Sequence, residues 1–275
     1  MIEDRWRHRE TVGMIPNGGT HIAVATDHVI ESFRNKLWLG YKTSAGAPRE
    51  LLAQFHQLED VLSAAGIAVW PMIEFEVDDA LAAGAAAAAR DKRVKQVIVC
   101  TPDKDLAQCV TGKRVVQLSR RTNVTLDEAG VVQKFGVKPE SIPDYLALVG
   151  DAADGYPGLP GWGAKSSAAV LAKFLHLESI PVDCRDWRVN ATNASDLAAT
   201  LCEQREQALL FRTLATLRAD IKLFDDAEQL RWSGPKPEFA ALAARLDAAR
   251  GESRSAEARK AVRRLTSNLC TSSPN

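Results

Sequence analysis

The chain has 275 residues, of which 46% are hydrophobic, and its 35 basic residues balance its 35 acidic ones, so net charge gives no global attraction to nucleic acid. No apolar run is long enough to cross a bilayer, and the charged start "MIEDRWRHRE" does not resemble a secretory signal. Five scattered cysteines without a C-x-x-C pair predict neither a disulfide framework nor a zinc site, so we expect a reduced, cytoplasmic chain with no membrane contact.

Four short β-branched runs predict buried strands, at 21–26 ("HIAVAT"), 67–72 ("IAVWPM"), 96–101 ("QVIVCT") and 115–119 ("VVQLS"). Helical patterns separate the first three runs. "PRELLAQFHQLEDVLSAAG" places Leu51, Phe55, Leu58 and Leu62 on one face, and "VDDALAAGAAAAARDKR" is an alanine-rich helix opened by two aspartates. This alternation predicts an α/β layer with a mostly parallel sheet flanked by helices.

The second half of the chain is predicted to be mainly helical. "TLDEAGVVQKFG" has Thr125 and Glu128 in capping-box spacing, and "SIPDYLALVG" and "KSSAAVLAKFLH" predict two further helices. The helical pattern continues over 196–217 and through "PEFAALAARLDAAR", and the polar tail after Gly251 is predicted to be partly disordered. We therefore expect an α/β domain over 1–122, a helical region over 123–225, and a carboxy-terminal helix with its tail over 226–275.

Carboxylates follow the predicted strands. They form four groups, which are Asp27; Glu76, Asp78 and Asp79; Asp103 and Asp105; and Asp151 and Asp154. The carboxyl ends of parallel strands meet at one edge of a sheet, so the first three groups should converge there. Each pair also has a simpler interpretation, as a favourable helix start, a solvated turn or ordinary loop residues.

A gathering of eight carboxylates requires cations, because two of them 4 Å apart repel by about 4 kcal/mol at an effective dielectric constant of 20. The ligands are oxygens, and no His or Cys stands at ligand spacing, so the expected metal is Mg²⁺ or Mn²⁺. Two such ions can activate a water and stabilise the leaving oxygen of a phosphodiester. The acids therefore predict phosphodiester hydrolysis.

The stretch "GLPGWGAKSS", at 158–167, has the glycine spacing of a Walker A loop, but Ala164 stands where that loop requires lysine, and Lys165 is one residue late. The turn also follows a helix and an acidic loop rather than a buried strand. A nucleotide-binding loop, as in a small-molecule NTPase, is thus disfavoured. Two interpretations remain, a plain turn between helices or a turn whose backbone N–H groups hold the phosphate of a nucleic-acid strand.

Four segments together resemble the 5′-3′ exonuclease and flap endonuclease family, which includes the amino-terminal nuclease domain of bacterial DNA polymerase I. They are "SFRNKLWLGYK", "EFEVDDALA", "CTPDKDLAQCV" and "YLALVGDAADGYPGLPGWGAKSSAAVL", in this order. The resemblance covers roughly residues 21–225. It implies a PIN-like α/β domain followed by a helix-hairpin-helix (H3TH) region, and cleavage of DNA near the junction of single strand and duplex.

The resemblance also implies roles for individual residues. The eight acids Asp27, Glu76, Asp78, Asp79, Asp103, Asp105, Asp151 and Asp154 fall on the family's metal site for two ions. Arg34 and Lys42 match basic residues near the arch that steers the 5′ end of DNA. The H3TH turn would grip duplex backbone, often with a bound K⁺, through Gly158, Gly161, Gly163, Lys165, Ser166 and Ser167.

The chain departs from the family pattern in two places. Family members open with a strand that carries an aspartate, whereas only about twenty residues precede "HIAVAT" here, and Asp4 among them has charged rather than strand-like surroundings. Ala45 replaces a usual arginine shortly after "YK". Two hypotheses stay open, a nuclease whose sequence is truncated or mis-started at Met1, and a catalytically impaired DNA-binding protein of the same ancestry.

The expected partners are a 5′-flap or 5′-ended DNA duplex and a separate DNA polymerase, with the chain itself a monomer.

Overall fold

The strands lie mostly parallel, in two small sheets. In the computed structural model, which describes residues 18–248, β1 (Ala23–Asp27) pairs in parallel with β2 (Ala68–Met72). The second sheet pairs β3 (Val97–Cys100) in parallel with β4 (Val115–Ser119), and β4 in antiparallel fashion with β5 (Val124–Leu126). The four predicted strands and the parallel arrangement are confirmed. Two details differ, since β5 was not predicted and the strands of the described part form two hydrogen-bonded sheets.

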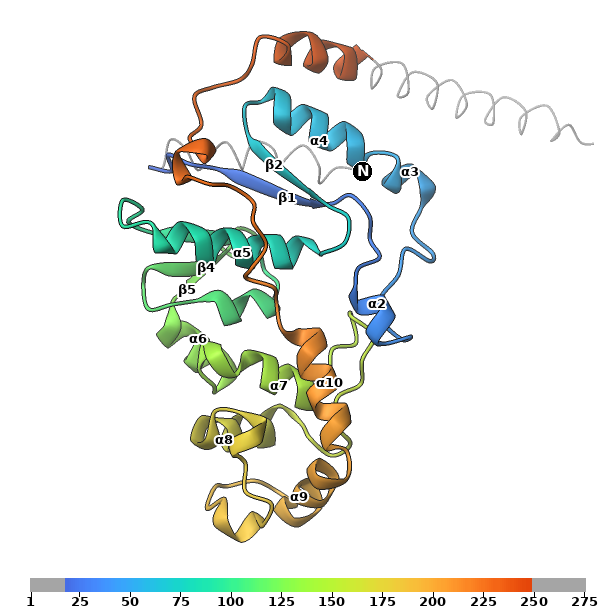
Figure 1. The fold of residues 1–275 in the computed structure, drawn as a ribbon, viewed down its shortest axis with the longest axis vertical. Helices are drawn as coiled ribbons and strands as arrows, with labels where there is room; N and C mark the ends of the chain where they lie inside the picture. The colour runs from blue at the N-terminus through green and yellow to red at the C-terminus, as the bar shows by residue number, and fades with distance from the viewer. Residues whose placement is uncertain (1–17, 249–275) are drawn as a thin grey trace, which may run out of the picture.

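The helices of the first half are α2 (Arg34–Leu37), α3 (Arg49–Leu52), α4 (Phe55–Ala64) and α5 (Val77–Arg90). α5 contacts both sheets and so joins them (Figure 1). Its alanines allow this close packing, and at Gly84 even a Cβ atom would lie 2.6 Å from the Trp70 ring. The predicted pair of helices flanking the first sheet is therefore confirmed, with the region 49–64 divided into two helices.

The second half is helical, as predicted. Its helices are α6 (Glu128–Phe135), α7 (Ile142–Val149), α8 (Ala164–Phe174), α9 (Ala194–Glu203) and α10 (Arg205–Ala215), and its 3-10 turns are η2 (Pro139–Ser141), η3 (Leu177–Ser179), η4 (Cys184–Asp186) and η5 (Ala227–Leu230). A further 3-10 turn, η1 (Asp105–Cys109), belongs to the first half and lies between β3 and β4.

Two helix predictions of this half are corrected. Thr125 lies in β5, and the N-cap of α6 is Asp127, whose side chain accepts a hydrogen bond from the Gly130 N–H. The long helix predicted over 196–217 is two helices, which meet at Gln204, where φ −110° and ψ 28° leave the α-helical region.

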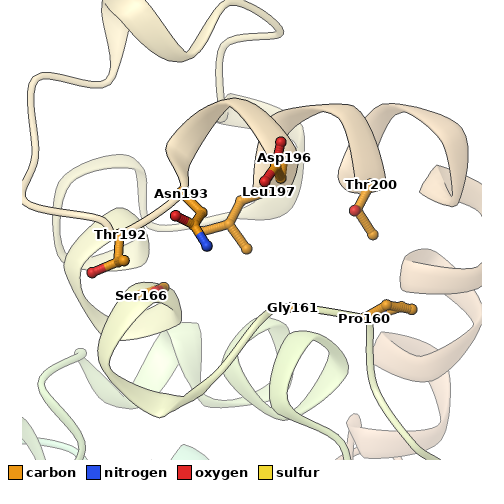
Figure 2. A pocket seen from close by; sticks show the side chains of 8 residues that line it. All are labelled: Pro160, Gly161, Ser166, Thr192, Asn193, Asp196, Leu197 and Thr200. Atoms are coloured by element: carbon orange, nitrogen blue, oxygen red, sulfur yellow. The ribbon is translucent and has the colours of Figure 1, made fainter.

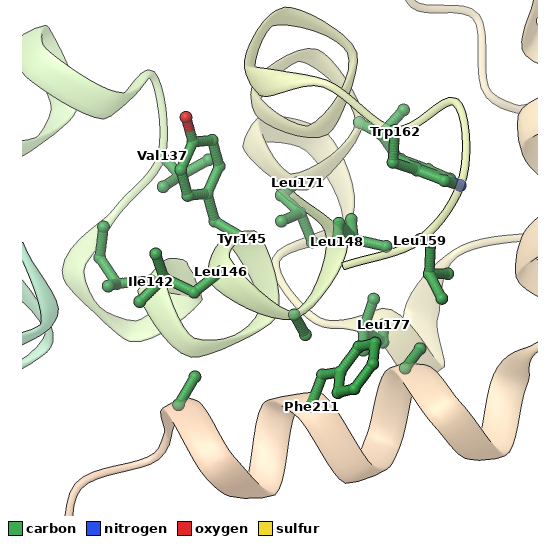
Figure 3. Packing of buried hydrophobic residues seen from close by; sticks show 14 of the residues in the cluster. Val137, Ile142, Tyr145, Leu146, Leu148, Leu159, Trp162, Leu171, Leu177 and Phe211 are labelled. Carbon is green, nitrogen blue, oxygen red and sulfur yellow. The ribbon is translucent and has the colours of Figure 1, made fainter. Parts of the chain in front are cut away.

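The largest apolar core lies in the helical half. Leu146, Leu148, Leu171 and Phe211 are at most 1% exposed there and pack α7, α8 and α10 together (Figure 3). A smaller core around Leu62 packs α4 on the first sheet, and a third, around Leu106, joins α5 to the second sheet. Each half of the fold thus has apolar packing of its own.

Residues 216–232 form a return segment that runs from the end of α10 back to the first sheet (Figure 1). Its end pairs with the start of β1, since the Ile22 N–H donates to the Leu230 carbonyl at 2.8 Å and the Trp232 N–H to that of Thr20 at 3.2 Å. Residues 239–248 are helical, as predicted, and Phe239 packs on the core beside α4. The tail predicted to be disordered after Gly251, and Asp4, lie outside the described residues.

Among residues 18–248, no helix has the length and apolar character needed to span a membrane.

Candidate metal centre and nucleic-acid interface

The carboxyl ends of the first two strands meet at the start of α5. Asp27 is the last residue of β1 and stands opposite Met72, the last residue of β2. Asp27 Oδ1 accepts a hydrogen bond of 3.0 Å from the N–H of Val77, the first residue of α5. The chain between β2 and α5 therefore brings Glu76 and Asp78 to the end of β1, as the sequence predicts.

Three further carboxylates form the tightest acidic group of the described residues. Asp105 follows β3, and Asp151 and Asp154 follow α7; one oxygen from each lies within 4.8 Å of the others. Asp105 Oδ1 is buried and accepts no hydrogen bond, and the Lys104 ammonium is 3.7 Å away. A buried carboxylate oxygen without a donor, facing two more carboxylates, fits the all-oxygen ligand set of a hard divalent cation.

The electrostatics of these acids favour bound positive charge. Burial, with a contribution from the neighbouring carboxylates and above all from Asp103, raises the pKa of Asp105 to about 8. Burial likewise raises the pKa of Asp78 to about 7, again with help from Asp103. The pKa values of Asp27 and Asp154 are also raised, first by burial. A cation would favour the ionised form of each group.

Seven of the eight predicted acids are linked by their electrostatic influence on one another or by the close approach of Asp105, Asp151 and Asp154, and we call this set the acidic rim: Asp27, Glu76, Asp78, Asp103, Asp105, Asp151 and Asp154.

Two lysines lie within the acidic rim. The Lys42 ammonium is 2.7 Å from a Glu76 oxygen and 2.9 Å from an Asp154 oxygen, and Lys104 forms an ion pair with Asp151. The Tyr41 hydroxyl donates to Glu76 at 3.2 Å. Lys42 is thus placed where its ammonium could contact a phosphate that approaches these acids. Sequence reasoning did not select Tyr41 or Lys104, although both stand inside the quoted motifs.

Asp79 and Arg34 form a buried ion pair beside the acidic rim. This pair corrects two expectations, that Asp79 belongs to the metal site and that Arg34 steers the 5′ end of DNA. The Arg34 guanidinium, 1% exposed, donates to both oxygens of Asp79 at 2.7 Å. Its other N–H bonds go to Glu76 and to the carbonyls of Leu214 and Thr216. Each Asp79 oxygen also accepts a backbone N–H. Arg34 therefore has no donor free for a phosphate, and Asp79 no oxygen free for a metal.

The glycine turn joins the loop after α7 to α8. Gly161, at φ 80°, and Gly163, the N-cap of α8, are exposed, as is Lys165. No side chain caps α8, so no side-chain acceptor occupies its first backbone N–H groups, and uncapped N–H groups at a helix start can bind phosphate. Three of the six predicted residues are thus on the surface, and Ser166 is half-buried.

The other two residues of the predicted DNA contact are buried. Ser167 is fully buried within α8, and Gly158, at φ 71°, packs so closely that a Cβ atom would lie 2.4 Å from the Gly150 nitrogen. Both side-chain positions are occupied by packing inside the fold, so neither can reach a DNA strand.

A pocket of about 260 Å³ lies between the glycine turn and α9. In Figure 2 Pro160, Gly161 and Ser166 line one side, opposite Asp196, Leu197 and Thr200. The lining has a carboxylate and no basic side chain, so it is not suited to phosphate.

A possible metal-ligand group that the sequence analysis did not predict is formed by His28, His56 and Glu59. The expectation that no His stands at ligand spacing is therefore wrong. The sequence pattern that could have indicated this group is the H-x-x-E spacing of His56 and Glu59, which places both side chains on one helix face.

Comparison with known proteins identifies the family of both halves. Residues 12–136 match the family model described as "5'-3' exonuclease, N-terminal resolvase-like domain", and residues 137–238 match "5'-3' exonuclease, C-terminal SAM fold". The boundary between the two matches, at 136, falls within the helical region predicted over 123–225.

Curated relatives cover most of this chain. DNA polymerase I of Pseudomonas aeruginosa is 33% identical over 225 residues, which are 78% of this chain but 24% of the polymerase. The 5'-3' exonuclease of Buchnera aphidicola subsp. Baizongia pistaciae is 30% identical over 218 residues, covering 78% of this chain and 71% of that exonuclease.

Solved structures share the fold. The bacteriophage T5 D15 protein co-crystallised with metal ions aligns with a TM-score of 0.59 at 19% identity, over 77% of this chain and 84% of that one. A D15 flap endonuclease variant in complex with DNA and metal ions aligns with a TM-score of 0.58 at 18% identity, over 76% and 78%. These structures show the shared fold, and the two domain matches and the curated relatives show that the chain belongs to the 5'-3' exonuclease family, whose members hydrolyse phosphodiester bonds.

Proposed function

We propose that this protein is a metal-dependent nuclease that cuts DNA at 5′ ends or 5′ flaps, with two hard divalent cations, Mg²⁺ or Mn²⁺, held by the acidic rim. The observation that carries the proposal is the group of Asp105, Asp151 and Asp154, with a buried Asp105 oxygen that accepts no hydrogen bond. Divalent cations bound there supply Lewis-acid stabilisation and a water of lowered pKa.

The chain's own residues position the substrate around that chemistry. Lys42, whose ammonium lies among the carboxylates and whose side chain is one-third exposed, offers positive charge to the scissile phosphate. Tyr41 holds Glu76 in place by a hydrogen bond. The backbone N–H groups at the start of α8, with Lys165 and Ser166, bind the duplex backbone. A K⁺ ion bound at the glycine turn is part of the same proposal.

Relatives support the DNA substrate. The D15 flap endonuclease and the catalytic core of Rad2 are described in complex with DNA, and the similarity to DNA polymerase I suggests that a polymerase works on the same DNA. We propose accordingly that the protein acts in replication or repair, as a monomer beside a separate polymerase.

The test is hydrolysis of a labelled 5′-flap duplex in Mg²⁺, with Asp103→Asn and Asp151→Asn variants and with Asp183→Asn as the matched control. Asp183 is a solvent-facing aspartate that is paired with Arg185 and is not part of the rim. We expect the two rim variants to lose at least 100-fold in rate and Asp183→Asn to cut as the wild type does. Absence of cleavage by the wild type at every Mg²⁺ or Mn²⁺ concentration would refute the enzymatic proposal.

A second candidate is a structure-specific DNA-binding protein with impaired catalysis. The observation that favours it is that Lys42 and Lys104 already form ion pairs with four rim carboxylates, those of Glu76, Asp105, Asp151 and Asp154. Tight flap binding without cutting, unchanged in Asp151→Asn, is the result that this candidate predicts.

A further inference from the structure

A group of two imidazoles and one carboxylate lies beside the acidic rim but is not part of it. One ligand atom each from His28, His56 and Glu59 lies within 4.8 Å of the others. His28 Nδ1 is 2.8 Å from Glu59 Oε2, and His56 Nδ1 is 3.9 Å from the same oxygen. Two imidazole nitrogens therefore converge on one carboxylate oxygen.

The local structure explains why the three side chains meet. His56 and Glu59 are three residues apart on α4 and so share a face of that helix. His28 follows β1 directly, and its ring meets the His56 ring edge-on at 4.4 Å. Residues 28 places apart in the sequence are thus brought together by the packing of α4 on the first sheet.

The Glu59 carboxylate is held in place by Thr26, a residue outside the three-residue group. The Thr26 hydroxyl donates to Glu59 Oε1 at 2.7 Å, which leaves Oε2 for the two imidazoles. Hydrogen bonds of this kind orient the ligands in metal sites. The Glu59 side chain is only 11% exposed, whereas that of His56 is 68% exposed and can adjust.

The ligand set selects the metal. Two imidazoles and a carboxylate suit a transition metal, and with a fourth position left for water they match three-ligand zinc sites, whereas Mg²⁺ prefers oxygen alone. Zinc bonds of 2.0–2.1 Å at tetrahedral angles place two ligand atoms about 3.3 Å apart. The observed 2.8 Å and 3.9 Å lie on either side of that value, so small side-chain shifts complete the site.

We propose that His28, His56 and Glu59 bind one transition-metal ion, Zn²⁺, at a site separate from the acidic rim. The bound ion cross-links the end of β1, next to Asp27, to α4. It would replace the direct contact between His28 Nδ1 and Glu59 Oε2 and leave the two hard-cation positions to the rim.

The experiment uses the full chain in excess Mg²⁺, which occupies the acidic rim, and Co²⁺ as a coloured substitute for Zn²⁺. We expect one equivalent of Co²⁺ to bind with the intense visible absorption of a four-coordinate, nitrogen-ligated ion, and Zn²⁺ to displace it. His56→Ala should weaken Co²⁺ binding at least tenfold, and Thr26→Val, which removes the hydrogen bond to Glu59, 10- to 100-fold. His56 is mostly exposed, so its removal leaves the fold intact.

Two control variants distinguish this site from other histidines and from the acidic rim. His21→Ala removes another half-exposed histidine, and Asp151→Asn disables the acidic rim; both should keep the Co²⁺ spectrum. The proposal is overturned if the wild type shows no such spectrum, if His56→Ala keeps it, or if Asp151→Asn abolishes it. Flap cleavage in Mg²⁺ is a separate measurement, so either proposal can fail alone.

Discussion

Asp105 is an acid whose burial works against the stability of the fold. Its pKa is raised from 3.8 to about 8 by burial and by neighbouring carboxylates. The folded state therefore holds this proton more tightly than the unfolded state, and the resulting penalty is absent below about pH 4, grows as pH rises and is complete above about pH 8. Stability of the metal-free protein should fall across that window.

Replacing Asp105 with Asn should remove this penalty. We expect Asp105→Asn to stabilise the metal-free protein at pH 8 by about 1–3 kcal/mol and to change it little at pH 4, while cleavage in Mg²⁺ is lost. Urea unfolding in the presence of a chelator at both pH values measures the difference. An equal gain at both pH values would show that the carboxyl charge is not the cause.

The Arg34–Asp79 pair should matter for stability rather than for DNA. Arg34→Met leaves a fully buried aspartate without its partner, and we expect a loss of about 3–5 kcal/mol in the free energy of unfolding. The matched control is Arg185→Met, which breaks an exposed pair with Asp183 and should cost less than about 1 kcal/mol. If Arg34→Met folds as stably as the control and loses only flap affinity, the guanidinium steers phosphate after all.

At the scale of the element, the glycine turn combines packing with an open helix end. Gly158→Ala should destabilise the protein by about 1–3 kcal/mol, because φ is 71° and the new Cβ would meet the Gly150 nitrogen. Thermal unfolding measures this loss.

Gly163→Ser is the informative comparison at the same turn. Nothing lies within 4 Å of its Cβ position, and serine is a favourable N-cap, so stability should change by less than about 0.5 kcal/mol. Its hydroxyl would however occupy the N–H groups at the start of α8, and duplex affinity should fall severalfold in a binding titration. Unchanged affinity would mean that this helix start does not contact DNA.

Some helices and strands could be predicted from the sequence, and others could not. The strands β1 to β4 were predicted because buried parallel strands are short runs of β-branched residues. β5 was not, since Thr125 has a capping pattern locally and joins a strand only by pairing with Leu118 on β4. The division between α9 and α10 was missed for a similar reason, because no Gly or Pro marks the break at Gln204.

The candidate site shows the same limit. Acids at strand ends could be placed because the sheet topology fixes where those ends lie. Asp79 could not be separated from Asp78, since the difference depends on Arg34 and on the carbonyls at the end of α10, some 180 residues away in the sequence. The roles of the individual acids as metal ligands remain a prediction.

At the scale of the whole molecule, the first sheet depends on the return segment. Trp232 donates its Nε1–H to the Ala65 carbonyl at 2.8 Å and packs on the small core there. We expect Trp232→Ala to increase hydrogen exchange in β1 and β2 while α7 and α8 stay protected, because their core is separate. Phe174→Ala, in the helical core, is the matched control and should give the reverse pattern. Equal loosening of both halves in both variants would show one cooperative unit.

The return segment also bears on the order in which the protein is made. β1 leaves the ribosome before the helical half, yet the backbone groups that pair with residues 20–22, directly before β1, belong to residues 230–232. The helical half, whose core is formed mainly by residues 131–215 with Tyr41, Ala107 and Val110 from the first half, can pack before those residues emerge. The strand that ends at Asp27 is therefore synthesised before the helical half but completed after it, so a nascent chain would fold the proposed duplex-binding helices before it completes the proposed metal site.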